Sequence, residues 1–436
     1  MADFARSAHP GVQAQLDRLA KLSPAGDRLG LERIGELLER IGRPQDKLPP
    51  VFHVAGTNGK GSTVAFLRAA LEAAGHKVHA FTSPHLVRFN ERIRIAGRLI
   101  DDEQLAAILD QVLGASGGIE PSFFEVATAV ALLAFAEAPA DACLLEVGLG
   151  GRLDSTNVVD RPLVTGIASL ALDHQHFLGN RLVDIAGEKA GIAKPDVPLV
   201  TQLYPPQIGS RIWQIARDNG ALWLPRGTSW DAAVRHGKLR YRDEQGSLAL
   251  PLPRLPGKHQ ATNAALAVAM LRHQQAIHVP DSALCAAMGS VDWPARMQKL
   301  SRGPLSRLLP QRNELWLDGG HNPAAARAMA EHVQLRFADD LPLVLVFASL
   351  GSKDPKNTLA PFRGIAAQVL TVPIAGHDDR DPEELARLAQ ALGFLANAYR
   401  NVDEALKAIQ IPARVLIFGS LYLAGEVLAA NGDSPD

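Results

Sequence analysis

The sequence predicts an α/β protein in which a mostly parallel sheet domain carries a small antiparallel insertion and a second, smaller α/β domain follows. Three observations lead to this prediction. The chain has 436 residues, and at roughly 100–200 residues per domain this length favours two or three domains. Short apolar runs alternate with longer Ala- and Leu-rich stretches, which is the pattern of strand–helix–strand units. Around 222–252 the runs become short and alternating, which indicates antiparallel strands.

The expected elements follow from this alternation. In the first part of the chain we expect strands at 51–54, 78–81, 142–147, 163–170 and 199–202, with a helix over 62–74. After 298 we expect strands at 314–317, 343–348, 368–372 and 414–418, with helices near 324–335, 382–392 and 420–430. We therefore predict a first domain over 1–297 and a second domain over 298–436.

Composition argues against several classes of function. Lys plus Arg number 45 and Asp plus Glu number 46, so the basic excess that marks nucleic-acid or membrane-surface proteins is missing, and we expect neither partner. The first 21 residues carry scattered charges and no apolar core segment, so we expect no secretory leader. With only two cysteines, Cys143 and Cys285, we expect a cytoplasmic protein in a reducing compartment.

The sharpest local signal is an apolar strand followed by a glycine-rich turn and a helix, in the sequence VFHVAGTNGKGST over 51–63. Glycines let main-chain N–H groups point into a concavity, the helix start adds partial positive charge, and Lys60 can reach the β- and γ-phosphates of a nucleotide. The strict phosphate-loop spacing fails, because Val54 stands at the first glycine position and Gly61 follows the lysine. The alternative is a simple strand–helix connection with a solvated Lys60.

Other strands also lead into polar residues at their carboxyl ends, where ligands bind in open α/β sheets. They reach Ser83, Glu146 and the pair Asp173-His174. An acid in the position of Glu146 is typical of a Mg²⁺ ligand in phosphate-loop enzymes. The alternatives are an ion pair for Glu146, a cap for Ser83, an ordinary histidine for His174 and a salt bridge for Lys189, and His176 competes with His174 on chemistry alone.

Six motifs together resemble a known family. They are GTNGKGST (56–63), TSPHL (82–86), EVGLGGRLDSTN (146–157), DHQHFLG (173–179), EKAGI (188–192) and DGGHNP (318–323). Their order and spacing resemble the bacterial bifunctional dihydrofolate synthase/folylpolyglutamate synthases, a family related to the muramyl peptide ligases. The resemblance implies an ATP-dependent acid–amino-acid ligase that joins L-glutamate to dihydropteroate and to folates through an acyl phosphate, releasing ADP and phosphate. It also implies two Mg²⁺ sites, small-molecule partners only and, we expect, a monomer.

Two other functions compete with this one. Another acid–amino-acid ligase of the muramyl superfamily is the first, although the roughly 50 residues before the glycine-rich turn are too few for the additional N-terminal domain of cell-wall relatives. The second is a nucleotide-hydrolysing switch, which the additional α/β domain and the missing N-K-x-D motif disfavour.

The resemblance implies roles for individual residues. The residues that it implies for contacts with ATP are Thr57, Asn58, Gly59, Lys60, Gly61, Ser62, Asn263, Arg296 and Asp318. Metal ligation falls to Ser83 and Glu146, with His174 at a second metal. Catalytic roles fall to Lys60, His174, Lys189, Asp154, His321 and Ser420, and Lys189 matches a lysine that is carbamylated in relatives. Substrate contacts fall to Leu29, Gly30, Leu31, Glu32, Phe124, Leu153, Asp154 and Ser155. The nucleotide is expected between the two domains.

Some residues depart from the family pattern or have simpler interpretations. Gly320, Ala295 and the pair Leu421-Tyr422 replace the more usual residues, and the last change weakens the glutamate-side assignment of Ser420. Three arginines alternate with isoleucines and predict the solvated face of a strand: Arg92, Arg94 and Arg98. His321-Asn322-Pro323 also predicts a helix start, with Asn322 as N-cap.

Overall fold

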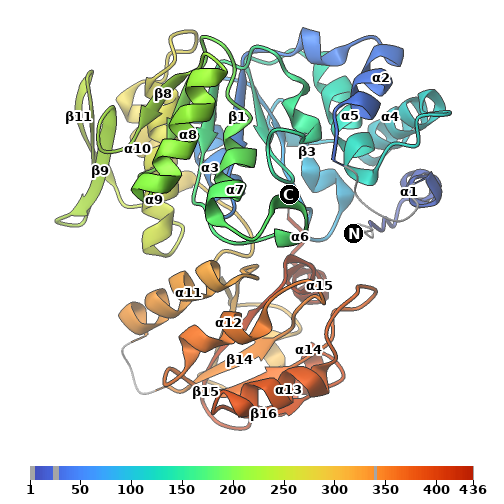
Figure 1. The fold of residues 1–436 in the computed structure, drawn as a ribbon. Coiled ribbons are helices and arrows are strands. Elements are labelled where there is room, and N and C mark those ends of the chain that lie inside the picture. Colours follow the sequence, from blue (N-terminus) through green and yellow to red (C-terminus); the bar gives the residue numbers. More distant parts are fainter. Residues whose placement is uncertain (1–4, 23–28, 338–340, 436) are drawn as a thin grey trace. The chain divides into compact units, whose positions relative to one another are not determined.

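The chain forms two compact units, seen in a computed structural model that describes residues 5–22, 29–337 and 341–435 (Figure 1). The first unit comprises residues 1–254 and 260–292, with residue 436, and the second comprises residues 255–259 and 293–435. Each unit contains its own sheet and its own apolar core. Across the described ranges, no helix combines the length and the apolar character that a bilayer crossing requires.

The first unit is organised by an eight-stranded sheet with the order β4-β3-β2-β5-β1-β6-β7-β8. Six of these strands run parallel, and only β3 and β4 at one edge are antiparallel. The strands are β1 (Val51–Ala55), β2 (Val78–Phe81), β3 (Ile93–Ile95), β4 (Arg98–Leu99), β5 (Ala142–Glu146), β6 (Val164–Ile167), β7 (Pro198–Thr201) and β8 (Leu222–Pro225). The five strands expected in this region are confirmed, with ends that shift by a few residues.

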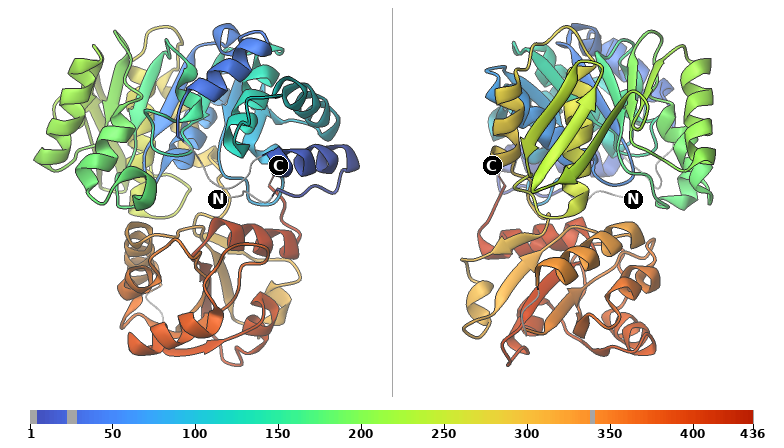
Figure 2. Two further views of the ribbon diagram at one scale, coloured as in Figure 1. Left: turned by 45° about the vertical axis from the view of Figure 1, so that its right-hand side comes forward. Right: turned by 90° about the vertical axis from the view of Figure 1, so that its left-hand side faces the viewer.

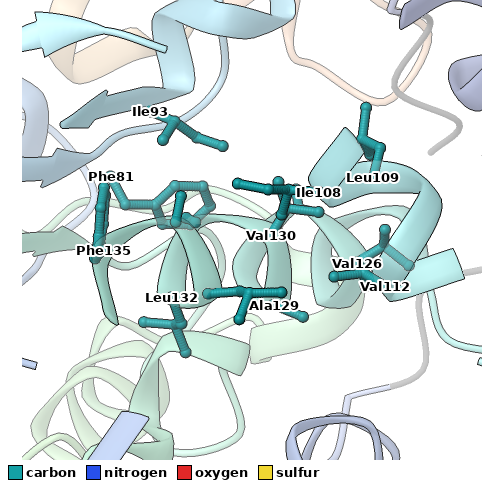
Figure 3. Packing of buried hydrophobic residues seen from close by; sticks show 14 of the residues in the cluster. Phe81, Ile93, Ile108, Leu109, Val112, Val126, Ala129, Val130, Leu132 and Phe135 are labelled. Atoms are coloured by element: carbon teal, nitrogen blue, oxygen red, sulfur yellow. The ribbon is translucent and has the colours of Figure 1, made fainter. Parts of the chain in front are cut away.

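Helices cover the sheet and bury its apolar residues. They are α1 (Pro10–Leu22), α2 (Glu32–Arg40), α3 (Lys60–Ala73), α4 (Asp102–Ala115), α5 (Phe123–Ala136), α6 (Gln175–Leu178), α7 (Leu182–Ala190), α8 (Pro206–Asp218), α9 (Lys258–Arg272) and α10 (Asp281–Ser290). One apolar cluster joins α4 and α5 to Phe81 and Ile93 of the sheet (Figure 3). Helix α5 is buried along nearly its whole length, which explains why its sequence is apolar rather than amphipathic.

The insertion is a separate three-stranded antiparallel sheet of β9 (Trp230–Arg235), β10 (Lys238–Asp243) and β11 (Gly246–Pro251) (Figure 2, right). Leu239 and Tyr241 alternate with exposed residues and are buried, so this part of the prediction is confirmed. The first segment of the expected insertion is different, because β8 pairs in parallel with β7 at the edge of the main sheet. Four residues are too few for their periodicity to identify a partner strand.

The second unit has a six-stranded sheet with the order β12-β13-β17-β14-β15-β16, parallel except for β12. Its strands are β12 (Gln298–Leu300), β13 (Glu314–Leu317), β14 (Leu343–Phe347), β15 (Ala366–Thr371), β16 (Leu395–Ala398) and β17 (Arg414–Phe418), and its helices are α11 (Pro323–Arg336), α12 (Pro355–Leu359), α13 (Pro382–Ala391), α14 (Val402–Lys407) and α15 (Leu421–Asn431). All four expected strands are present, so the predicted fold class is confirmed. Strands β12 and β16 and helices α12 and α14 are not among the expected elements, because segments of three to six residues carry little periodicity.

Candidate active site

The glycine-rich turn joins β1 to α3 at the middle of the sheet, with β5 on one side of β1 and β6 on the other. The main-chain N–H groups of Thr57 and Asn58 donate to the Ser169 carbonyl, at 2.8 and 3.2 Å. The turn is therefore anchored to the segment after β6. The first N–H groups of α3, from Lys60 onward, have no partner within the helix, so they are the donors that an anion can use. Gly61 and Ser62 lie in this first turn and are buried.

Asn263, from α9, lies directly against this turn. A Cβ added at Gly59 would lie 2.3 Å from the Asn263 Oδ1 atom. Gly59 also has φ +86° and precedes the first residue of α3, so both its conformation and its neighbour require glycine. The structure therefore brings together the turn and a residue that lies about 200 positions further along the sequence.

Glu146 ends β5 beside the turn. Its Oε1 atom lies 3.9 Å from the Lys60 Nζ atom, and the side chain is 5% exposed. The Ser83 main-chain N–H, after β2, donates to the Glu146 Oε2 atom at 3.2 Å. Lys60, Ser83 and Glu146 thus meet at the carboxyl ends of three neighbouring strands, as the sequence predicts.

This set of groups fits a divalent cation of the magnesium type. No three His, Cys, Asp or Glu side chains among the described residues form a group that could hold a metal ion. Mg²⁺ is usually bound by only one or two carboxylates, together with waters and substrate phosphates. Glu146, with Ser83 next to it and beside the glycine-rich turn, supplies this kind of partial shell, whereas the described residues form no site made of protein ligands alone.

His174 lies at the start of α6 after β6. It has φ +50°, its main-chain N–H donates to the Asp173 Oδ1 atom at 2.8 Å, and its side chain is 33% exposed. The imidazole Nε2 atom lies 4.0 Å from the same carboxylate oxygen. His174 therefore lies in the segment after β6, seven residues beyond the end of that strand, and its role at a second metal stays a prediction.

Lys189 is buried in the last turn of α7. Its Nζ atom contacts the Gly150 carbonyl at 3.5 Å, and no carboxylate within the described chain lies close enough to form a salt bridge with it. Burial and the nearby charge of Lys60 lower the pKa of Lys189 to about 7, although Asp173, Asp154 and Glu188 act in the opposite direction. The salt-bridge interpretation is therefore wrong, because the amine is largely desolvated rather than paired.

The loop after β5 carries three of the expected substrate residues. Asp154 is buried and accepts hydrogen bonds from the main-chain N–H groups of Leu149 and Thr156, at 2.8 and 3.0 Å. Leu153 is half-buried, and Ser155 begins a short 3₁₀ helix. At the start of the loop, a Cβ on Gly148 would lie 2.4 Å from the Phe124 ring. Phe124 therefore packs directly against this loop.

The stretch from Leu29 to Glu32 leads into α2, which an ion pair links to the start of α5. The Arg33 Nε atom lies 3.1 Å from the Glu125 Oε2 atom, and the Glu125 side chain is 3% exposed. Leu31 and Phe124 pack against the same apolar cluster. Leu29 and Gly30 are partly buried, whereas Glu32 is exposed.

In the second unit, residues expected at the site gather at the carboxyl ends of β13 and β17. Asp318 is buried and accepts from the main-chain N–H groups of Met297 and Gly320, at 2.8 and 2.7 Å. Burial raises the pKa of Asp318. A Cβ added at Gly319 would lie 2.9 Å from an Arg296 guanidinium nitrogen, so Arg296 lies beside this strand end.

His321 and Ser420 lie in the segments that follow these two strands. The His321 Nδ1 atom lies 3.1 Å from the Gly319 carbonyl, and the Ser420 hydroxyl caps α15 by accepting from the Tyr422 N–H. Asn322 caps α11 through the Ala325 N–H, which confirms the predicted helix start.

Two positions that depart from the family pattern have a conformation or surroundings that favour glycine. Ala295 has φ +53°, a left-handed conformation that glycine adopts more easily. Gly320 has little space, since a Cβ there would lie 2.8 Å from the Met329 Cε atom.

The expectation of a solvated arginine face is wrong for one of its three members. Arg92 is 0% exposed. Its Nε atom donates to the His85 Nδ1 atom at 2.8 Å, and its guanidinium stands over the rings of Phe89 and Phe123. Alternation with isoleucine could not reveal this, because Arg92 lies in a 3₁₀ turn before β3 begins.

Comparison with known proteins agrees with this geometry. Residues 307–421 match the family described as "Mur ligase, glutamate ligase domain". The dihydrofolate synthase/folylpolyglutamate synthase of Bacillus subtilis is 35% identical over 430 residues, covering 92% of this chain and 95% of the relative. The structure of Escherichia coli FolC in complex with DHPP and ADP has a TM-score of 0.85 and 33% identity, covering 98% of both chains.

A crystal structure of a bifunctional folylpolyglutamate synthase/dihydrofolate synthase with Mn, AMPPNP and L-glutamate bound has a TM-score of 0.84 and 31% identity, covering 98% of this chain and 99% of the other. Because 98% of this chain is covered, the structural likeness includes both units. The chain belongs to the dihydrofolate synthase/folylpolyglutamate synthase family.

Proposed function

We propose that this protein uses ATP to ligate L-glutamate to dihydropteroate, giving dihydrofolate, and to folates, giving polyglutamates. The single observation that carries the proposal is the meeting of Lys60, Glu146 and Ser83 beside the turn before α3. Family membership supplies the substrates, because relatives named for both activities align over nearly the whole chain.

The chemistry requires positive charge around two anions. A carboxylate is a poor electrophile, so its oxygen first attacks the γ-phosphorus of ATP, the bond to the bridging oxygen breaks and ADP leaves. The amine of glutamate then attacks the acyl carbon, loses a proton and displaces phosphate. Lys60 and the first N–H groups of α3 bind the phosphates and offset their charge. A magnesium ion held by Glu146 and Ser83 would neutralise charge that develops on the transferred phosphoryl group.

Nucleotide contacts are also proposed for Asn263, Arg296 and Asp318, on the basis of the resemblance. Asn263 lies against Gly59, and Arg296 and Asp318 adjoin the end of β13. A second metal at His174 and roles for His321 and Ser420 at the glutamate side belong to the same proposal.

We further propose that Lys189 is carbamylated. Carbon dioxide reacts with a neutral amine, and a lysine whose pKa is lowered to about 7 has a substantial neutral fraction at physiological pH. In protein labelled with ¹³C-bicarbonate, carbon NMR is expected to show a carbamate signal that disappears in Lys189→Arg. A spectrum identical in both proteins would contradict the modification.

The reaction is tested with purified protein, ATP, Mg²⁺, radiolabelled L-glutamate and either dihydropteroate or a reduced folate. We expect ADP, phosphate and label in a pterin product. AMP and pyrophosphate would overturn the acyl-phosphate route. Label in a product that contains no pterin would favour another acid–amino-acid ligase. We also propose that the protein is a monomer, which size-exclusion chromatography with light scattering tests. A reducing cytoplasmic location is proposed as well, and the two free cysteines, Cys143 and Cys285, support it.

A further inference from the structure

Three polar side chains, joined by two hydrogen bonds, form a buried series next to the loop that follows β5. His53 stands in the middle of β1 and is 0% exposed. Its Nε2 atom lies 2.8 Å from the Thr156 hydroxyl, and that hydroxyl donates to the Asp154 Oδ1 atom at 2.5 Å. All three residues are buried. Strand β1 also leads into the glycine-rich turn. The hydrogen-bonded series therefore links the centre of the sheet to the loop after β5.

The chemistry of the three groups fixes the direction of both hydrogen bonds. Burial and the charge of Lys194 lower the pKa of His53 to about 3, so its imidazole is neutral and carries one proton. Burial raises the pKa of Asp154, whereas its hydrogen bonds with Leu149 and Thr156 act in the opposite direction. Both of its carboxyl oxygens receive a main-chain N–H group, and Oδ1 also receives the Thr156 hydroxyl, so the carboxyl group acts as the acceptor. The only hydroxyl proton of Thr156 is therefore used, and its oxygen accepts a hydrogen bond from the His53 Nε2–H. His53 is thus the Nε2–H tautomer.

This tautomer leaves the His53 Nδ1 atom as a buried acceptor. Within the described part of the chain, the atom has no hydrogen-bond partner. A buried polar group without a partner disfavours folding, and an apolar side chain in an otherwise apolar strand would avoid that cost. His79, in the neighbouring part of the sheet, is different. It accepts from the Ala96 N–H, contacts the Ala138 carbonyl and stacks on Phe135.

The loop that His53 supports is held at several points. The Asp154 Oδ2 atom accepts from the Leu149 N–H, so the carboxylate closes the loop on itself. A Cβ on Gly151 would lie 2.7 Å from the Glu188 carbonyl, so the loop also contacts the main chain of α7, next to Lys189. The carboxylate of Asp154 therefore accepts both the hydrogen bond that closes the loop and the hydrogen bond from the Thr156 hydroxyl that connects it to His53.

We propose that His53 is a positioning residue whose Nε2–H orients the Thr156 hydroxyl and, through it, holds the Asp154 carboxylate and its loop in the conformation that binds the pterin substrate. The proposal rests on the proposed function and on the family resemblance, which implies that Leu153, Asp154 and Ser155 contact that substrate. It does not make His53 a catalytic residue, because the imidazole reaches no reacting group.

The hydrogen-bond direction is tested first, without substrate. In protein labelled with ¹⁵N-histidine, the ring-nitrogen spectrum is expected to show a neutral Nε2–H histidine from pH 5 to pH 8, assigned to His53 by its loss in His53→Leu. A protonated ring or an Nδ1–H tautomer would overturn the proposal, whatever the enzyme's activity.

The effect on substrate is tested with steady-state kinetics. His53→Leu and Thr156→Val are expected to raise the KM for dihydropteroate by about fivefold, the scale of one net hydrogen bond, and to leave the KM for ATP within about twofold. Thr156→Ser keeps the hydroxyl and is expected to bind substrate normally. If His53→Leu does not fold, the comparison of Thr156→Ser with Thr156→Val tests the positioning role instead. His79→Leu is the matched control, and it is expected to lower the melting temperature without changing either KM.

The outcomes distinguish a failure of the positioning role of His53 from a failure of the proposed function. If Asp154→Asn raises the KM for dihydropteroate while His53→Leu and Thr156→Val leave it unchanged, the positioning role is wrong and the proposed function stands. If His53→Leu and His79→Leu change stability and KM alike, His53 is merely structural. If Asp154→Asn leaves the KM unchanged, the substrate role of Asp154 is wrong, and the proposal for His53 is overturned with it.

Discussion

Lys60 and Glu146 face each other across 3.9 Å at the carboxyl ends of β1 and β5. The two strands are paired in parallel, with Val54 opposite Glu146, so the register of the sheet itself brings the two groups together. Both side chains are largely buried, at 16% and 5% exposure, which strengthens their interaction relative to a surface pair. In the proposed function each partner would exchange the other for a ligand of opposite charge, Lys60 for a phosphate and Glu146 for a cation.

Replacing the cation of this pair tests the phosphate-binding role. Lys60→Ala is expected to lower kcat by at least about 100-fold, because a positioned charge at the transferred phosphoryl group is lost. The exposed Lys77, on the turn after α3, provides the control, and Lys77→Ala is expected to keep normal turnover. Steady-state rates of ADP release measure both. Near-normal turnover in Lys60→Ala would refute the assignment.

The acidic partner is tested by a change that preserves its shape. Glu146→Gln is expected to abolish ligation, because a neutral amide cannot replace the only protein carboxylate proposed for the first metal position. Raising Mg²⁺ across the millimolar range is expected to restore little activity. Glu137→Gln, at an exposed position after α5, serves as control. Full rescue by Mg²⁺ would reduce Glu146 to one of several weak ligands.

The lowered pKa of Lys189 predicts that the free energy of unfolding depends on pH. Its pKa is about 7 in the folded protein against an ordinary value of 10.5. Below pH 7 both states are protonated and the full penalty of burying the charge is present. Between pH 7 and 10.5 the folded state releases its proton first, so stability rises with pH, by at most roughly 1.4 kcal/mol per pH unit.

The measurement compares the wild type with Lys189→Met in urea, with dissolved carbon dioxide removed. The variant is expected to be the more stable protein at pH 6.5, and its advantage is expected to shrink steadily toward pH 10. An advantage that stays constant over this range would show that Lys189 keeps its ordinary pKa.

The ion pair between Arg33 and Glu125 is expected to hold the segment before α2 near Phe124. Arg33→Met leaves the buried Glu125 carboxylate without its cation, and the free energy of unfolding is expected to fall by about 1–3 kcal/mol. The exposed Arg98 offers a control, Arg98→Met, expected to change it by less than about 0.5 kcal/mol. A double-mutant cycle with Glu125→Gln measures the pair itself, and additive effects would show that the two side chains do not interact.

Sequence reasoning succeeded where the chemistry is local. The glycine-rich turn, the Asn322 cap and the strands ending near Ser83 and Glu146 were all predicted, because each depends on residues close together in sequence. It missed His53 and Thr156, although a histidine inside an otherwise apolar strand was a usable signal. It also placed Arg92 in solvent, because a charged residue becomes buried only when distant groups surround it.

The sequence by itself determined the fold class and the family and supplied the residues proposed for the site, since periodicity, turn residues and motif spacing are properties of the local chain. The tertiary structure alone decided the order of the strands and the state of each buried group. Strand order brings Lys60 to Glu146 and Asn263 to Gly59 from far apart in the sequence. Burial is a property of the assembled unit, and it is burial that lowers the pKa of Lys189 and keeps His53 neutral.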